Sequence, residues 1–117
     1  MSTVLEVNQT PYGRGSLDTE KFTIPDNSYI YWTCFKKRFR LLPIIPRSSA
    51  VKIYLLDPET RRVQKKSMPS NNGKIVIRRN NEGSAVIHRG GTYYLNIRWG
   101  SWVKKFVVRV DDGRRVN

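Results

Sequence analysis

The stretch that decides the fold lies near the C-terminus, where residues 91–110 read GTYYLNIRWGSWVKKFVVRV. Apolar and polar side chains alternate on both sides of Gly100, which is typical of half-buried β-strands and not of a helix. Glycine at the first corner of a two-residue loop meets the requirement of a type II′ turn. The sequence therefore predicts a hairpin with Gly100-Ser101 at its tip, in which Trp99 pairs with Trp102.

The predicted hairpin divides its side chains between two faces, because the residues of a cross-strand pair share one face of a sheet. The apolar face holds Tyr93, Leu95, Ile97, Trp99, Trp102, Phe106, Val108 and Val110, with Lys104 as the exception. The other face holds Tyr94, Asn96, Arg98, Val103, Lys105, Val107 and Arg109. We expect the first face to lie in the core and the second to form a basic surface.

Further strands are predicted along the rest of the chain, where short runs of Val, Ile, Tyr and Phe are bounded by Gly, Pro, Asn and Asp. They cover residues 4–7, 21–24, 29–35, 50–56, 62–67, 74–79, 84–88, 92–99 and 102–110. Turns are expected at residues 25–27, 57–60 and 69–73, and a hairpin tip at residues 80–83. Pro43 and Pro46 lack the donor of a sheet ladder, so residues 40–49 are expected to be a covering crossover.

The chain of 117 residues has the length of one domain, since domains typically run from about 50 to 250 residues. We expect an N-terminal strand and a flexible arm in residues 1–20, because Ser, Asn and Gly are frequent there. A β-sandwich domain is expected in residues 21–112 and a basic tail in residues 113–117.

One motif in the decisive stretch resembles a known family. Gly91-Thr92-Tyr93-Tyr94-Leu95 resembles the start of strand F in immunoglobulin-like sandwiches, where a tyrosine closes a corner by hydrogen-bonding back along the chain. The resemblance implies this role for Tyr93 and an inward position for Leu95. The expected fold is therefore all-β, an antiparallel, immunoglobulin-like β-sandwich of about seven to nine short strands. An OB-like barrel is the alternative, because its short strands have the same sequence pattern.

Side chains for enzyme chemistry are scarce. His88 is the only histidine and Cys34 the only cysteine, so a metal site built on several histidines or cysteines is excluded. Cys34 lies in a predicted strand beside aromatic residues, where a buried thiol is expected, and His88 is expected at the surface. The carboxylates are scattered along the chain. We therefore expect a protein that is not an enzyme, with no catalytic residues, no metal and no cofactor.

Charge is the strongest functional signal. Twenty-two Lys and Arg residues against nine Asp and Glu residues give a formal net charge of +13, which attracts polyanions. Like charges on neighbouring strands repel each other, and a bound anion relieves that repulsion. The residues expected to bind the anion or partner are Arg98, Lys105, Arg109, Tyr94, Lys36, Lys37, Arg38, Arg40, Arg61, Arg62, Lys65 and Lys66.

Three kinds of partner fit these observations. The first is an anionic surface of a larger assembly, on which the chain is a small structural or accessory subunit, similar to virion- or capsid-associated proteins. A homo-oligomer or a capsid-like host assembly belongs to this hypothesis. Residues 41–46 are expected to be either its apolar docking patch or a loop that covers the core. The second is nucleic acid, with Tyr12, Tyr29, Tyr31 or Tyr94 as base-stacking residues. The third is an acidic polysaccharide or a lipid surface, without membrane insertion. The polar first twenty residues contain no apolar segment of the signal-peptide kind, so we expect an intracellular (cytoplasmic) or virion-associated protein.

Overall fold

A computed structural model describes residues 3–36, 50–78 and 81–113 of the chain. The strands are β1 (Thr3–Gln9), β2 (Gly15–Asp18), β3 (Phe22–Ile24), β4 (Ser28–Lys36), β5 (Val51–Leu56), β6 (Lys74–Ile77), β7 (Asn81–Ile87), β8 (Gly91–Trp99) and β9 (Val103–Asp111). The helical structure in the described part is a single 3₁₀ turn at Pro69–Asn71. The prediction of an all-β protein is therefore confirmed.

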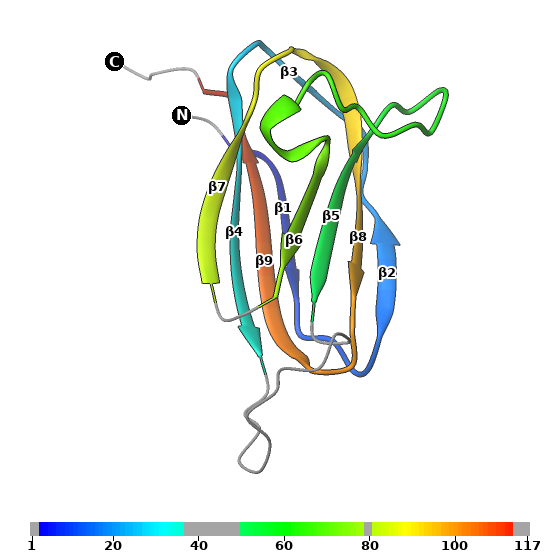
Figure 1. Ribbon diagram of the computed structural model, residues 1–117, viewed down its shortest axis with the longest axis vertical. Coiled ribbons are helices and arrows are strands. Elements are labelled where there is room, and N and C mark those ends of the chain that lie inside the picture. Colours follow the sequence, from blue (N-terminus) through cyan, green and yellow to red (C-terminus); the bar gives the residue numbers. More distant parts are fainter. Residues whose placement is uncertain (1–2, 37–49, 79–80, 114–117) are drawn as a thin grey trace.

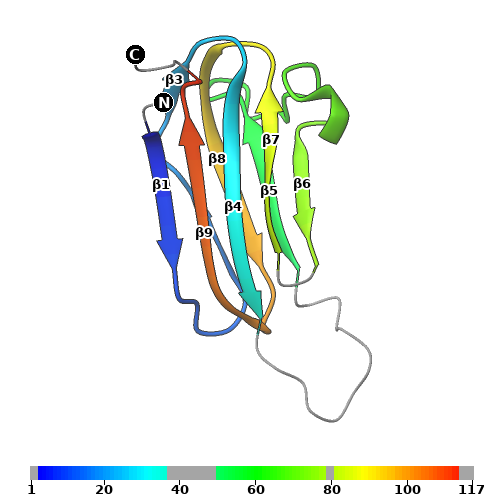
Figure 2. The same ribbon diagram turned by 90° about the vertical axis from the view of Figure 1, so that its left-hand side faces the viewer.

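The strands form two antiparallel sheets that pack face to face. One sheet has four strands in the order β1-β9-β4-β7, which lie side by side in Figure 2. The other has five strands, in the order β2-β8-β5-β6 with β3 also paired to β8, and Figure 1 shows them next to one another. The described chain is thus a β-sandwich and not a closed barrel.

The core lies between the two sheets and follows the period-two pattern of the strands. In β5, for example, Val51, Ile53 and Leu55 are buried while the residues between them are partly exposed. Leu95 of β8 and Phe106 of β9 are buried in the same core, as the sequence predicts. Each strand therefore has one face in the core and one facing outward.

The predicted closing hairpin is wrong, because β8 and β9 belong to different sheets. The Gly100 N–H donates to the carbonyl of Ala50 at 3.1 Å, and the chain crosses from one sheet to the other through residues 100–102. Both strands still turn their apolar residues inward, and the rings of Trp99 and Phe106 meet with centroids 5.3 Å apart. Val103, which was expected on the basic face, is buried because the pairing that placed it there does not form.

Other expectations also need correction. The predicted strand at residues 62–67 is a series of turns with one isolated bridge, between Leu56 and Val63. The hairpin expected with its tip at residues 80–83 does not form, because residues 81–83 belong to β7, and β6 and β7 lie in different sheets. Residues 1–20 were expected to be an N-terminal strand and a flexible arm. The structure also has β2 in this range, paired with β8. The expected crossover at residues 40–49 lies outside the described residues.

The order of the strands follows a nested pattern. Antiparallel pairs join β1 to β9, β2 and β3 to β8, β4 to β7, and β5 to β6. Since β2 pairs with residues 96–99 and β3 with residues 91–93, the two act as one interrupted strand along β8. The chain is therefore a long antiparallel ribbon, with β5 and β6 at its tip, folded over into two sheets. Immunoglobulin sandwiches have their last two strands in one sheet, whereas here those strands are separated.

Glycine is required where a tryptophan ring covers a neighbouring strand. Gly15 pairs with Trp99, and Gly83 pairs with Trp32. In both cases a Cβ atom built on the glycine would lie 2.6 Å from the indole ring. The absence of a side chain thus lets each ring lie flat over the adjacent strand.

The hydrogen bond expected of Tyr93 is present. The Tyr93 hydroxyl donates to the carbonyl of Arg89, four residues upstream, at 2.7 Å, and lies 2.9 Å from the hydroxyl of Ser67. Tyr93 and Ser67 are both buried, so these contacts replace water at the end of the core. They join the turn before β8 to the segment that leads into β6.

Removing the Tyr93 hydroxyl is expected to destabilise the fold. Tyr93→Phe leaves a buried serine hydroxyl and a carbonyl without their partner, a loss of about 1–3 kcal/mol. Tyr94→Phe is the matched control, because Tyr94 is half-buried on the outer face of the sheet and its change is expected to stay within about 0.5 kcal/mol. Urea unfolding measures both, and equal losses would contradict the corner described here.

Candidate functional site

The outer face of the five-stranded sheet carries a cluster of positive charge. Alternation along β5 turns Lys52 and Tyr54 away from the core, and neighbouring elements add cations around them. We define the basic face by the following six residues: Arg14, Lys52, Tyr54, Lys65, Lys74 and Arg98. Asp18 is the acid that β2 contributes to this side, and its carboxylate accepts a 2.7 Å hydrogen bond from the Asn96 amide.

The strand register brings these cations together from distant parts of the sequence. Lys52 of β5 lies opposite Arg98 of β8. Tyr54 lies opposite Lys74 of β6 on one side and Asn96 of β8 on the other. Like charges directly opposite each other on neighbouring strands destabilise a sheet. The fold therefore maintains a repulsive arrangement on this face.

Tyr54 is at the centre of the basic face. Its ring centroid is 5.3 Å from the guanidinium carbon of Arg98 and 5.4 Å from the Lys74 ammonium. Both distances are within the range of about 6 Å in which a ring attracts a cation. Tyr54 therefore holds one cation from each neighbouring strand close to its ring.

Two hollows open on either side of Tyr54. The first is lined by Arg14, Ala50, Lys52, Tyr54, Arg98, Trp99 and Gly100. The second is lined by Tyr54, Val63, Lys65, Asn71, Asn72, Lys74 and Val76. Cations thus line both hollows, and the tyrosine is common to them. This arrangement can receive an extended anion across the sheet.

The outer face of the four-stranded sheet carries both cations and acids among its described residues. Lys105 and Arg109 point outward there, and so do Glu6 and Glu82 on the flanking strands. Glu6 is directly opposite Arg109. Among the described residues, this face therefore mixes both signs of charge, whereas the basic face groups cations together.

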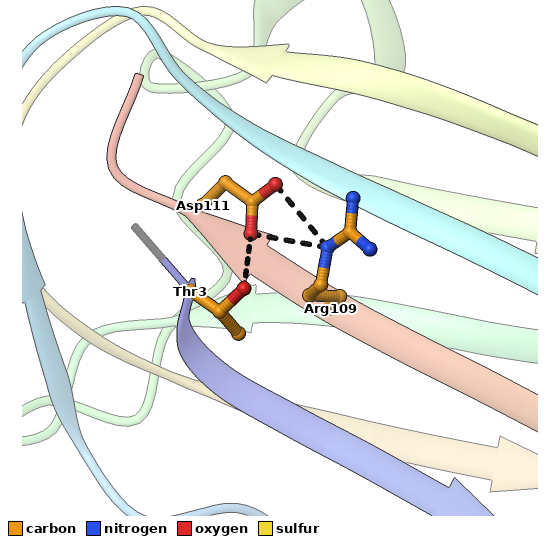
Figure 3. A network of polar contacts seen from close by, with 3 residues as sticks. All are labelled: Thr3, Arg109 and Asp111. Atoms are coloured by element: carbon orange, nitrogen blue, oxygen red, sulfur yellow. Dashed lines mark hydrogen bonds and ion pairs between the residues drawn. The ribbon is translucent and has the colours of Figure 1, made fainter. Parts of the chain in front are cut away.

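Arg109 is also occupied by contacts within the protein, as Figure 3 shows. Its Nε atom donates to both carboxylate oxygens of Asp111, at 3.1 and 3.2 Å, and Thr3 donates to the same carboxylate at 3.0 Å. The guanidinium also lies 4.8 Å from the centroid of the Tyr31 ring. Asp111 is buried, so its charge is balanced by Arg109. The Nε group of this arginine is therefore engaged in a contact within the fold, while its side chain is 43% exposed.

The connection between β5 and β6 presents several cations on a defined turn. One carboxylate oxygen of Asp57 accepts hydrogen bonds from the backbone N–H groups of Glu59 and Thr60, at 2.8 and 3.1 Å. The N–H of Thr60, followed by that of Glu59, holds the pKa of the Asp57 carboxyl below its ordinary value, because both stabilise the charged form. The predicted turn at residues 57–60 is confirmed, and it leads into the exposed residues Arg61 and Arg62.

The structure separates the binding residues that the sequence grouped together. Arg98 and Tyr94 lie on the outer side of the five-stranded sheet, whereas Lys105 and Arg109 lie on that of the other sheet. The expectation that these four share one face is wrong, because it depended on the hairpin. The predicted residues of the β5–β6 connection are Arg61, Arg62, Lys65 and Lys66, all exposed, and Lys65 joins the basic face. Lys36 ends β4; its side chain and the residues Lys37, Arg38 and Arg40 lie outside the described part.

Sequence reasoning missed four members of the basic face, which are Arg14, Lys52, Tyr54 and Lys74. The alternation of residues 51–55 already places Lys52 and Tyr54 on one side of a strand. The sequence does not show that β5 lies between β8 and β6, because neither pairing follows from local sequence. The cations on those two strands could therefore not be placed beside Lys52 and Tyr54.

A cluster of metal-binding side chains is not found in the described ranges. No three His, Cys, Asp or Glu side chains come together there in a way that would hold a metal ion. Cys34 is buried and His88 is exposed at the end of β7, as expected. The part of the chain that the structure covers also contains no helix long and apolar enough to cross a membrane.

Fold and site together define the class of this protein. Nested antiparallel pairs wound into two sheets are the arrangement of a jelly roll, which has eight strands, and here the interrupted strand formed by β2 and β3 counts as one. The described residues form a small jelly-roll sandwich, and the outer side of its five-stranded sheet carries the basic face. Comparisons with known protein families, curated proteins and solved structures give no match to it.

Proposed function

We propose that this chain is a non-enzymatic binding module that holds nucleic acid on its basic face. The observation that carries the proposal is the concentration of Arg14, Lys52, Lys65, Lys74 and Arg98 around Tyr54. On the opposite outer face, by contrast, the described cation Arg109 has the acid Glu6 directly opposite it. A phosphate backbone supplies a line of negative charge that matches such a face, and phosphate contacts dominate the affinity of nucleic-acid-binding proteins.

The repulsion between cations supports a binding role. Lys52 and Arg98 are paired across two strands, and such a like-charge pair costs folding free energy. A phosphate placed between them removes that cost. A surface that served solubility alone would not need its positive charges on adjacent strands of one sheet.

A role as a structural subunit of a larger anionic assembly is the second candidate. The nested order of the strands favours it, because jelly rolls include the domains of viral capsids. Fold alone does not determine function, so this candidate needs evidence of its own. A subunit docked through apolar contacts would depend little on salt.

The salt dependence of binding tests the proposal. Five phosphate contacts on a single strand predict a slope of log K against log salt of about −3.5, which is an affinity loss of about 100-fold between 50 and 200 mM salt. Fluorescence anisotropy with a labelled oligonucleotide measures this slope. A slope near zero would favour apolar docking, and absence of binding at 50 mM salt would contradict the proposal.

A further inference from the structure

We infer that the basic face selects single-stranded over double-stranded nucleic acid, and that Tyr12 and Tyr54 stack on its unpaired bases. The inference rests on the proposed function, because the same cations are required to hold the phosphates. It specifies single-stranded nucleic acid as the ligand and names Tyr12 and Tyr54 as the residues that determine this specificity.

Tyr12 is fully exposed to solvent, with a relative accessibility of 105%. It lies between β1 and β2, two residues before Arg14, which lines the first hollow beside Tyr54. The carbonyl of the adjacent Gly13 accepts a 3.0 Å hydrogen bond from the indole of Trp99. This bond fixes Gly13 to the end of β8. Tyr12 thus lies two residues before a member of the basic face and contributes no buried area to the fold.

Tyr54 lies where a base and its phosphates can be held at the same time. Arg98 and Lys74 approach its ring from β8 and β6, and the two hollows flank it. When phosphates attract these cations, the ring becomes a stacking surface between two occupied phosphate sites. Grooves that bind single strands combine these two elements, cations along the backbone and aromatic rings against the bases.

A duplex cannot use the two tyrosines in this way. Its bases are stacked on each other and paired, so it presents mainly phosphates to a sheet surface. A single strand offers the same phosphates and, in addition, an accessible π face on each base. Selection of single strands thus follows from the aromatic residues, while general attraction follows from the charge.

The test uses the full chain and three ligands of about twelve nucleotides, which are an oligothymidylate, an abasic strand with the same phosphates, and a duplex. Anisotropy at 0.1 M salt is expected to show the tightest binding to the oligothymidylate. Tyr12→Ala and Tyr54→Ala are each expected to weaken that binding by about 5- to 150-fold, which corresponds to about 1–3 kcal/mol per stacked base. Tyr12→Ala should leave the affinity for the abasic strand unchanged, and Tyr54→Ala, which also releases Arg98 and Lys74 from the ring, should weaken it less than it weakens binding of the oligothymidylate.

Tyr12→Phe and Tyr54→Phe are the matched controls, because they keep the ring and remove only the hydroxyl. Both are expected to bind the oligothymidylate like the unchanged protein. Tyr12→Ala removes a side chain that has no buried surface, so it separates a binding effect from a folding effect, and a thermal melt checks the same point for Tyr54→Ala.

The outcomes distinguish this inference from the proposed function. If the abasic strand or the duplex binds as tightly as the oligothymidylate, stacking is wrong while binding of the phosphates stands. If the alanine variants bind the oligothymidylate unchanged, the two tyrosines are not the stacking residues. If none of the three ligands binds, the proposed function fails and the inference fails with it.

Discussion

Replacing Lys52 and Lys74 with glutamate is expected to lower the affinity for a single-stranded oligonucleotide at least about 25-fold at 0.1 M salt. Each phosphate contact on a single strand contributes a salt slope of about 0.7, which is a factor of about 5 at this salt concentration. Two lost contacts multiply to about 25, and repulsion by the new carboxylates adds to the loss. The salt slope itself should fall by about 1.4.

The matched control reverses two cations away from the basic face. Arg89 is exposed in the turn before β8, and Lys105 is exposed on the outer side of the four-stranded sheet. Arg89→Glu with Lys105→Glu changes the net charge by the same amount, so it has the same effect on long-range attraction. We expect a small loss with an unchanged slope. Equal losses in the two double variants would mean that binding depends on total charge and not on one face.

The largest effect on stability is expected at the centre of the sandwich. Phe106 is 1% exposed and lies against Trp99 of the other sheet. Phe106→Ala removes a buried ring and leaves a cavity between the sheets, for which a loss of about 3–5 kcal/mol is typical. Equilibrium unfolding in urea, at constant buffer and temperature, gives the difference in the free energy of unfolding.

Phe35→Ala provides the control within the same sheet. Phe35 is paired with Lys105, next to the Cys34–Phe106 pair, but its ring is 46% exposed. Truncating it leaves no closed cavity, so a loss well below that of Phe106→Ala is expected. If the two phenylalanines cost the same, Phe106 does not lie between two packed sheets.

The sequence was sufficient to predict which side of a strand is buried, but not which strand lies beside it. Alternation in residues 93–97 and 106–110 correctly placed Leu95 and Phe106 in the core. The same alternation is satisfied whether two strands share a sheet or face each other across the core, because both arrangements bury the same side chains. The Gly100 loop favoured the hairpin locally, and the pairing of β9 with β1 and β4 decided the outcome. Those pairings join residues that are 67 to 108 positions apart in the sequence, so no local pattern predicts them.

The binding residues show the same limit. Lys65 and Arg98 were predicted from charge and lie on the basic face, whereas Arg109 was predicted with them and is held by Asp111. The composition shows how many cations the chain has, but the strand order determines which of them lie next to each other. Lys52 and Lys74 became candidates only when β5 was placed between β8 and β6.

Chemical labelling of lysines gives the most direct test that one sheet carries the binding surface. The protein is treated with an amine-acetylating reagent, with and without a saturating single-stranded oligonucleotide, and modification at each lysine is measured by mass spectrometry. Lys52 and Lys74 are predicted to be protected by the oligonucleotide, while Lys105 on the opposite sheet reacts equally in both samples. Protection of Lys105 with unchanged reaction at Lys52 and Lys74 would contradict the account.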